Sequence, residues 1–195
     1  IDRALASLDE AEKKLDIGMD EELADILKNR FRLFSKYGIV DKIPALSIKV
    51  DSLMSATSDK GVRLMCLELQ IDNAVKAGHT SEAISLCHDA IGLLETSSDT
   101  QGRDTKMYAI LNRLRPLCLA TQKYSEAMDI SRKMLAIREK DSGSDVGMEY
   151  FHVAEVYQAL RDTTKALSYV DSIMNNGGKP SVDPMMEGRH LQFYR

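Results

Sequence analysis

The chain lacks a long apolar run, and this absence argues against a membrane-spanning helix. No stretch of about 18 apolar residues occurs in its 195 residues, so the sequence predicts no membrane-spanning helix. No apolar leader of the signal-peptide type follows Ile1 either. Because the first residue is not Met, we expect the chain to be a fragment of a longer protein whose natural N-terminus has been removed.

An excess of positive charge is also missing. The chain has 26 Lys and Arg against 30 Asp and Glu, a net charge of -4 without any basic stripe. Nucleic-acid binding therefore has little electrostatic support, and we expect no nucleic-acid partner. Hydrophobic residues make up 44% and charged residues 29%, which is typical of a globular chain rather than a disordered one.

Cysteines are few, and none lies near another in the sequence. The chain has Cys66, Cys87 and Cys118, and no CxxC motif, which disfavours a zinc site and a thioredoxin-like redox site. Cys87 and Cys118 fall on the apolar faces of predicted helices, where cysteine acts as a small hydrophobe. A disulfide between these two residues is the alternative.

Enzyme motifs are absent as well. The four histidines are isolated in the sequence, with no HExxH and no His–Cys cluster, and no GxSxG or Gly-rich phosphate loop occurs. The acidic runs "DEAEKK" and "DEEL" lie near predicted helix N-termini, where the helix dipole favours them. We expect no enzymatic activity, no cofactor and no metal. The remote alternative is an enzyme whose site, around His152, is assembled across distant hairpins.

What the chain has is helical periodicity from end to end. Apolar residues recur at i, i+3 and i+4 in segments separated by Gly, Pro and polar turns, and no credible strand is present. We predict an all-α protein of about nine helices. They span about residues 1–16, 20–37, 41–56, 62–77, 81–95, 105–121, 124–139, 146–160 and 163–175, and 184–195 reads as the start of a further helix. Asp20 is expected to cap the second of these helices.

Three of the helix pairs repeat one arrangement. They are "LELQIDNAVKAGHTSEAISLCHDAIGLL", "LNRLRPLCLATQKYSEAMDISRKMLAI" and "YFHVAEVYQALRDTTKALSYVDSIM". In each, a helix enters a short polar turn, and the second helix carries a small residue near its start: Ala83, Ala127 and Ala166. The intervals between these alanines are 44 and 39 residues, and a recurring helical hairpin of this kind is typical of a solenoid.

These hairpins resemble the tetratricopeptide repeat (TPR) family. Its first helix has a bulky–x–x–Leu–Gly–x–x–Tyr pattern, and its second has Ala–x3–Phe–x2–Ala. The matching positions, hairpin by hairpin, are Leu67, Gln70, Ile71, Ala74, Ala83, Cys87 and Ala90; then Leu111, Leu114, Arg115, Cys118, Ala127, Ser131 and Met134; then Tyr150, Val153, Ala154, Tyr157, Ala166, Val170 and Ile173. The resemblance implies a right-handed superhelical solenoid of antiparallel helix hairpins.

The resemblance covers about residues 21–175 and has departures. Arg115 and Ile71 stand where small residues are expected, and the intervals exceed the usual 34 residues of the family. A weaker hairpin over 21–56 would use Ala45 as its small residue. A HEAT-like array and a non-repetitive helical domain are the structural alternatives. On the first interpretation, residues 1–195 form one solenoid fragment with an N-terminal helix at 1–18, hairpins at 21–56, 62–95, 105–139 and 146–175, and a further helix beginning at 184.

The TPR resemblance also implies a function. It predicts a non-enzymatic protein–protein interaction module whose first helices line a concave face that holds a protein or peptide segment. On this interpretation the residues that contact the partner are Glu68, Leu69, Asp72, Asn112, Arg113, Leu119, Phe151, His152 and Glu155. The Lys, Asn and Arg clamp with which some TPR domains hold the C-terminal carboxylate of heat-shock chaperones is not reproduced.

A second, looser resemblance concerns signal transduction. The long, degenerate spacing is similar to the TPR-rich sensor regions of bacterial membrane-bound regulators, mainly of the Bacteroidetes type. This hypothesis implies an extracytoplasmic signal-sensing region of a two-component or transcriptional regulator, located in the periplasm, whereas an ordinary scaffold would be cytoplasmic. In either case the exposed ends of the solenoid would allow self-association.

Overall fold

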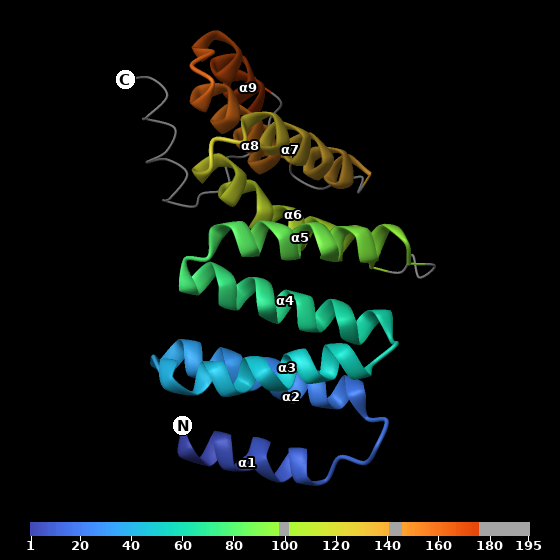
Figure 1. The fold of residues 1–195 in the computed structure, drawn as a ribbon. Helices are drawn as coiled ribbons and strands as arrows, with labels where there is room; N and C mark the ends of the chain where they lie inside the picture. The colour runs from blue at the N-terminus through green and yellow to red at the C-terminus, as the bar shows by residue number, and fades with distance from the viewer. Residues whose placement is uncertain (98–101, 141–145, 176–195) are drawn as a thin grey trace. The chain divides into compact units, whose positions relative to one another are not determined.

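The fold is built from helices joined by short connections. The computed structural model describes residues 1–97, 102–140 and 146–175. In these ranges it has nine α-helices, one 3-10 helix and no strand, which confirms the all-α prediction (Figure 1). The helices are α1 (Asp2–Lys13), α2 (Asp20–Tyr37), η1 (Val40–Lys42), α3 (Ile43–Ala56), α4 (Lys60–Ala77), α5 (Thr80–Glu95), α6 (Arg103–Ala120), α7 (Tyr124–Glu139), α8 (Gly147–Ala159) and α9 (Thr163–Asn175). The helix predicted from 184 lies outside the described residues.

The helix termini follow the Gly, Pro and charge signals of the sequence, with one exception. Asp20 is the first residue of α2 rather than its cap; Met19 precedes the helix, and no side chain makes a capping hydrogen bond there. Asp20, Glu21 and Glu22 instead place three acidic groups in the first turn, where the helix dipole favours negative charge. Pro44 lies at the start of α3, where its missing N–H costs nothing.

Pro116 does not interrupt α6, which continues to Ala120. A proline within a helix leaves the carbonyl four residues earlier without its usual donor, and here that residue is Asn112. Both Pro116 and Asn112 are exposed, so water can solvate the unpaired carbonyl.

The chain divides into two compact units, Ile1–Thr100 and Gln101–Arg195. The core of the first unit lies between α2, α3 and α4, and its buried residues are Ala24, Leu27, Phe31, Phe34, Leu46, Val50, Leu53, Val62, Cys66 and Leu69. In the second unit, α8 and α9 share the core residues Phe151, Ala154, Ala166, Val170 and Ile173. One continuous solenoid over 1–195 stays a prediction.

Three hairpins share one turn geometry, which periodicity alone did not reveal. Shortly after each first helix comes a residue in the left-handed conformation: Gly78 (φ 76°) directly after α4, and Gln122 (φ 60°) and Arg161 (φ 61°) two residues after α6 and α8. The N–H groups of this residue and of the next one donate back to the last turn of the helix, as in a Schellman motif. In each hairpin one of these two bonds joins residues five positions apart. These bonds are His79 N to Ala74 O at 2.9 Å, Lys123 N to Cys118 O at 2.8 Å and Asp162 N to Tyr157 O at 2.9 Å.

The predicted small residues lie at the same place in these hairpins. Ala83, Ala127 and Ala166 each follow the left-handed residue by five positions, and all three are fully buried. In each case the alanine N–H donates to the carbonyl that opens the second helix: His79 O, Lys123 O and Asp162 O. A methyl side chain here lets the two helices approach closely. Ala154 of α8 is also fully buried and packs in the same core as Ala166.

The prediction for Ala45 was wrong. Ala45 is exposed, whereas its neighbour Leu46 is buried. Leu46, Val50 and Leu53 recur at i, i+4 and i+7 and define the buried face of α3, which places Ala45 about 100° away on the helix surface. The 3-10 turn η1 shifts the start of α3, so that the hairpin over 21–56 lacks the alanine found at the start of α5, α7 and α9.

In each unit, the second helix of one hairpin also packs against the first helix of the next hairpin. In the first unit α3 contacts both α2 and α4, and in the second α7 contacts both α6 and α8. The two helices of a hairpin are antiparallel: Lys60 at the start of α4 reaches Thr96 after α5, and Lys140 after α7 reaches Asp104 at the start of α6. Neighbouring hairpins therefore stack within each unit.

Candidate functional site

The predicted partner-binding residues separate into buried and accessible groups. Leu69, Phe151 and His152 have only 5%, 1% and 6% of their surface exposed, so the expectation that they project from an open face was wrong. Phe151 packs against Ala154, Ala166 and Val170 in the core of the second unit, and Leu69 belongs to the core of the first. Their positions on the first helices face the neighbouring helices rather than solvent.

The other six predicted residues retain accessible surface. Asn112 is exposed, and the partly exposed residues are Glu68, Asp72, Arg113, Leu119 and Glu155. They lie on α4, α6 and α8, which are the first helices of the three similar hairpins. Their contact with a partner stays a prediction.

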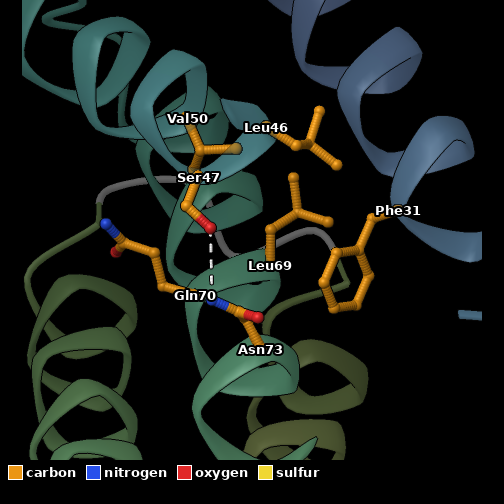
Figure 2. Close-up of a pocket in the computed structure, with 7 residues that line it drawn as sticks. All are labelled: Phe31, Leu46, Ser47, Val50, Leu69, Gln70 and Asn73. Carbon is orange, nitrogen blue, oxygen red and sulfur yellow. Dashed lines mark hydrogen bonds between the residues drawn. The ribbon is translucent and has the colours of Figure 1, made fainter. Parts of the chain in front are cut away.

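The junction of α2, α3 and α4 in the first unit leaves little empty space. Figure 2 shows a small hollow where α2, α3 and α4 meet, lined by Phe31, Leu46, Ser47, Val50, Leu69, Gln70 and Asn73. It has room for about 10 Å³, roughly one water molecule. Asn73 donates to the Ser47 hydroxyl at 3.2 Å, drawn as a dashed line in Figure 2. Gln70 donates to Asp51 at 2.6 Å. The hollow is therefore too small for an organic ligand.

A polar seam joins α6 and α8 in the second unit. The Arg115 guanidinium donates to Glu155 at 2.8 Å, and the Tyr108 hydroxyl donates to Glu149 at 2.6 Å. Tyr108 and Arg115 are seven residues apart and so share one face of α6. Glu149, His152 and Glu155 are spaced by three and share one face of α8. Arg115, which stands where the TPR resemblance would have a small residue, is therefore paired with Glu155 across the two helices.

Glu149 is the most deeply buried charged side chain of this seam, with 1% exposure. One carboxylate oxygen accepts from both Tyr108 and the Arg138 Nε–H, the latter at 3.3 Å, while the other oxygen has no hydrogen-bond partner. Burial and the hydrogen bond to Glu149 raise the pKa of Tyr108 to about 12. The phenol therefore stays protonated near neutral pH and acts as a donor.

A larger hollow opens beside this network. It has a volume of about 500 Å³ and is lined by Asp104, Thr105 and Tyr108 of α6 and by Ile137, Arg138 and Lys140 at the end of α7. The Arg138 guanidinium lies over the Tyr108 ring, 4.9 Å from its centroid, and Lys140 pairs with Asp104 at 2.9 Å. The Lys140 hydrogen bond holds the pKa of Asp104 below its usual value. No local pattern in the sequence predicts this site, because Arg138 and Glu149 belong to different hairpins.

Metal-ligating and thiol side chains also occur in the described part of the chain. No group of three or more His, Cys, Asp or Glu residues there is arranged to hold a metal ion. All three cysteines are buried and none forms a disulfide, which agrees with the prediction that Cys87 and Cys118 act as small hydrophobes. Burial, followed by the nearby Asp51 and Asp20, raises the pKa of Cys66 to about 11, so its thiolate is scarce at neutral pH.

No protein-family model matches the chain, and no curated protein matches it. The resemblance to the TPR family thus rests on the hairpins themselves. Among the described helices, none has the length and apolar character needed to cross a bilayer.

Proposed function

We propose that the chain is a non-enzymatic, TPR-like interaction module. Its hairpins would form a right-handed superhelical solenoid that presents the first helices to a protein or peptide segment. The observation that carries the proposal is the shared joint of three hairpins, in which a left-handed residue is followed five positions later by a fully buried alanine. A recurring joint of this kind supports repeated stacking rather than one closed core.

The packing of the second helices supports the first helices as the partner-binding face. Because α3 and α7 each contact two first helices, the second helices are occupied in holding hairpins together. On α6, Asn112 is exposed and Arg113 and Leu119 are partly exposed, which combines an amide, a cation and an apolar side chain on one first helix. Such a mixture suits a partner held by hydrogen bonds and an apolar anchor.

Site-specific photo-cross-linking tests the proposal. A photoreactive amino acid placed at Asn112, on the first helix, is expected to cross-link one partner protein in a lysate of the source cells. The matched control carries the same amino acid at Arg132, which is exposed on the second helix α7. An Arg113→Glu change should reduce cross-linking from position 112, and Arg132→Glu should leave it unchanged.

Two outcomes would contradict the proposal. One is the same set of cross-linked proteins from both positions, which would mean collisional labelling. The other is cross-linking from 112 that is insensitive to Arg113→Glu. Circular dichroism of each variant confirms that its helices are intact.

A further inference from the structure

The hollow between α6 and α7 contains an arginine that is held in place by its surroundings. Arg138 uses its Nε–H to donate to Glu149 and lies over the Tyr108 ring, so two contacts fix the plane of the guanidinium. Glu149 is itself almost fully buried and cannot move into solvent without breaking its bond from Tyr108. An arginine fixed in this way loses little freedom when it binds a ligand.

The same arginine remains accessible from the hollow. Its side chain is 44% exposed, whereas that of Glu149 is 1% exposed. Guanidinium has five N–H donors in a planar fork, and the bond to Glu149 uses only the one on Nε. The guanidinium also hydrogen-bonds to Tyr108. Two N–H groups of the terminal nitrogens match the two oxygens of a carboxylate or phosphate in a bidentate arrangement.

The charge balance selects between these two anions. Arg138 and Lys140 line the hollow together with Asp104, and Glu149 lies directly behind Arg138. These four charges cancel, and Lys140 already pairs with Asp104. The N-terminus of α6 and the C-terminus of α7 meet at this hollow, so their dipoles oppose each other. Any anion adds net negative charge to this neutral set, so a phosphate with nearly two charges is disfavoured more than a carboxylate with one.

We infer that the hollow lined by Arg138, Tyr108 and Lys140 is a binding site for a single carboxylate group. Its volume of about 500 Å³ falls in the range of small-ligand pockets. The carboxylate belongs either to a small organic acid or to the end of a peptide. Thr105 adds a hydroxyl on the wall of the hollow. Thr105 and Tyr108 precede Asn112 on α6 by seven and four residues, so the hollow lies toward the N-terminus of that helix. The inference does not depend on the proposed function.

Nuclear magnetic resonance of the full chain tests the site with four probes. They are propionate, acetyl-trialanine with a free carboxylate, the corresponding amide, and inorganic phosphate. The Nε–H signal of Arg138 and the backbone amides of Thr105 and Tyr108 are expected to shift saturably with a carboxylate, and not with the uncharged amide. Tighter binding of propionate assigns the site to small acids, and tighter binding of the peptide assigns it to a chain terminus.

Two conservative variants test whether binding needs the planar guanidinium of Arg138 or only its positive charge. Arg138→Lys keeps the positive charge beside Glu149 but removes the planar fork, and we expect binding at least about tenfold weaker. Arg132→Lys, on the exposed surface of the same helix, should bind as the unchanged chain does. The inference is overturned if neither carboxylate gives a saturable shift, if Arg138→Lys binds equally well, or if phosphate binds more tightly than both carboxylates.

Discussion

Arg115 of α6 and Glu155 of α8 form an ion pair at 2.8 Å between two hairpins. The Arg115 side chain is 9% exposed and that of Glu155 is 25% exposed, so the cation is the more deeply buried partner. Its Nε has no hydrogen-bond partner. A buried charge of this kind depends strongly on its counter-ion.

Glu155→Ala should therefore lower the free energy of unfolding by about 2–3 kcal/mol, because it leaves Arg115 buried without a counter-ion. The double change Arg115→Leu with Glu155→Ala should recover most of this loss, since no buried charge remains. Urea denaturation followed by circular dichroism measures both. A double variant as unstable as the single one would show that the pair does not control stability here.

The alanines at the hairpin joints should not tolerate a larger side chain. Ala83 is fully buried at the start of α5, and Ala83→Leu is expected to lower the free energy of unfolding by about 1–3 kcal/mol through overpacking. Ala45→Leu is the matched control. Because Ala45 is exposed, its substitution should change stability by no more than about 0.5 kcal/mol. Equal losses in the two variants would mean that Ala45 also lies in a helix–helix contact.

The left-handed residues at the joints should respond to substitution in opposite directions. Gly78→Ala should lower the free energy of unfolding by about 1–2 kcal/mol. An added Cβ there meets no atom within 4 Å, so the loss would come from the backbone conformation alone. Gln122→Gly relieves the same strain and should be neutral or stabilising by up to about 1 kcal/mol. Thermal unfolding of both variants measures the effect, and a destabilised Gln122→Gly would contradict it.

Tyr108 should make stability depend on pH at alkaline values. Its pKa is raised from 10.0 to about 12 in the folded chain, so the folded state holds the phenolic proton more tightly than the unfolded state does. The stabilisation is present in full below pH 10 and is lost as the pH rises through about 12. Tyr108→Phe removes this titration.

The difference in unfolding free energy between the unchanged chain and Tyr108→Phe should thus be constant below pH 10 and shrink toward pH 12. Comparing the two chains cancels the titration of other groups. Urea denaturation at a series of pH values gives the difference. A difference that does not change over this range would exclude a raised Tyr108 pKa.

The sequence predicted the helices well because their signals are local. The stripe of Leu23, Ile26, Leu27 and Phe31, ended by Gly38, predicts α2 as residues 20–37, and the helix spans Asp20–Tyr37. Glycine in the left-handed conformation stops the helix without help from distant residues. The joints at Gln122 and Arg161 were harder to predict, because these side chains carry no comparable signal.

The polar network between α6 and α8 was harder to predict because its hydrogen-bonded pairs are distant in sequence. Glu155 pairs with a residue 40 positions away, and Glu149 with one 41 positions away. Periodicity places Phe151 and His152 on α8, but a helix that contacts neighbours on several sides has little hydrophobic asymmetry to show which face is open. For this reason the assumption that both face solvent failed.

The turn shared by the three hairpins depends on backbone torsion and on main-chain hydrogen bonds. Glycine, glutamine and arginine all occupy its left-handed position. A joint with this property accepts side chains of different kinds at that position at a cost of about 1–2 kcal/mol relative to glycine, whereas the buried alanine five positions later must stay small. Related chains can therefore differ at the left-handed residue and still keep the same turn.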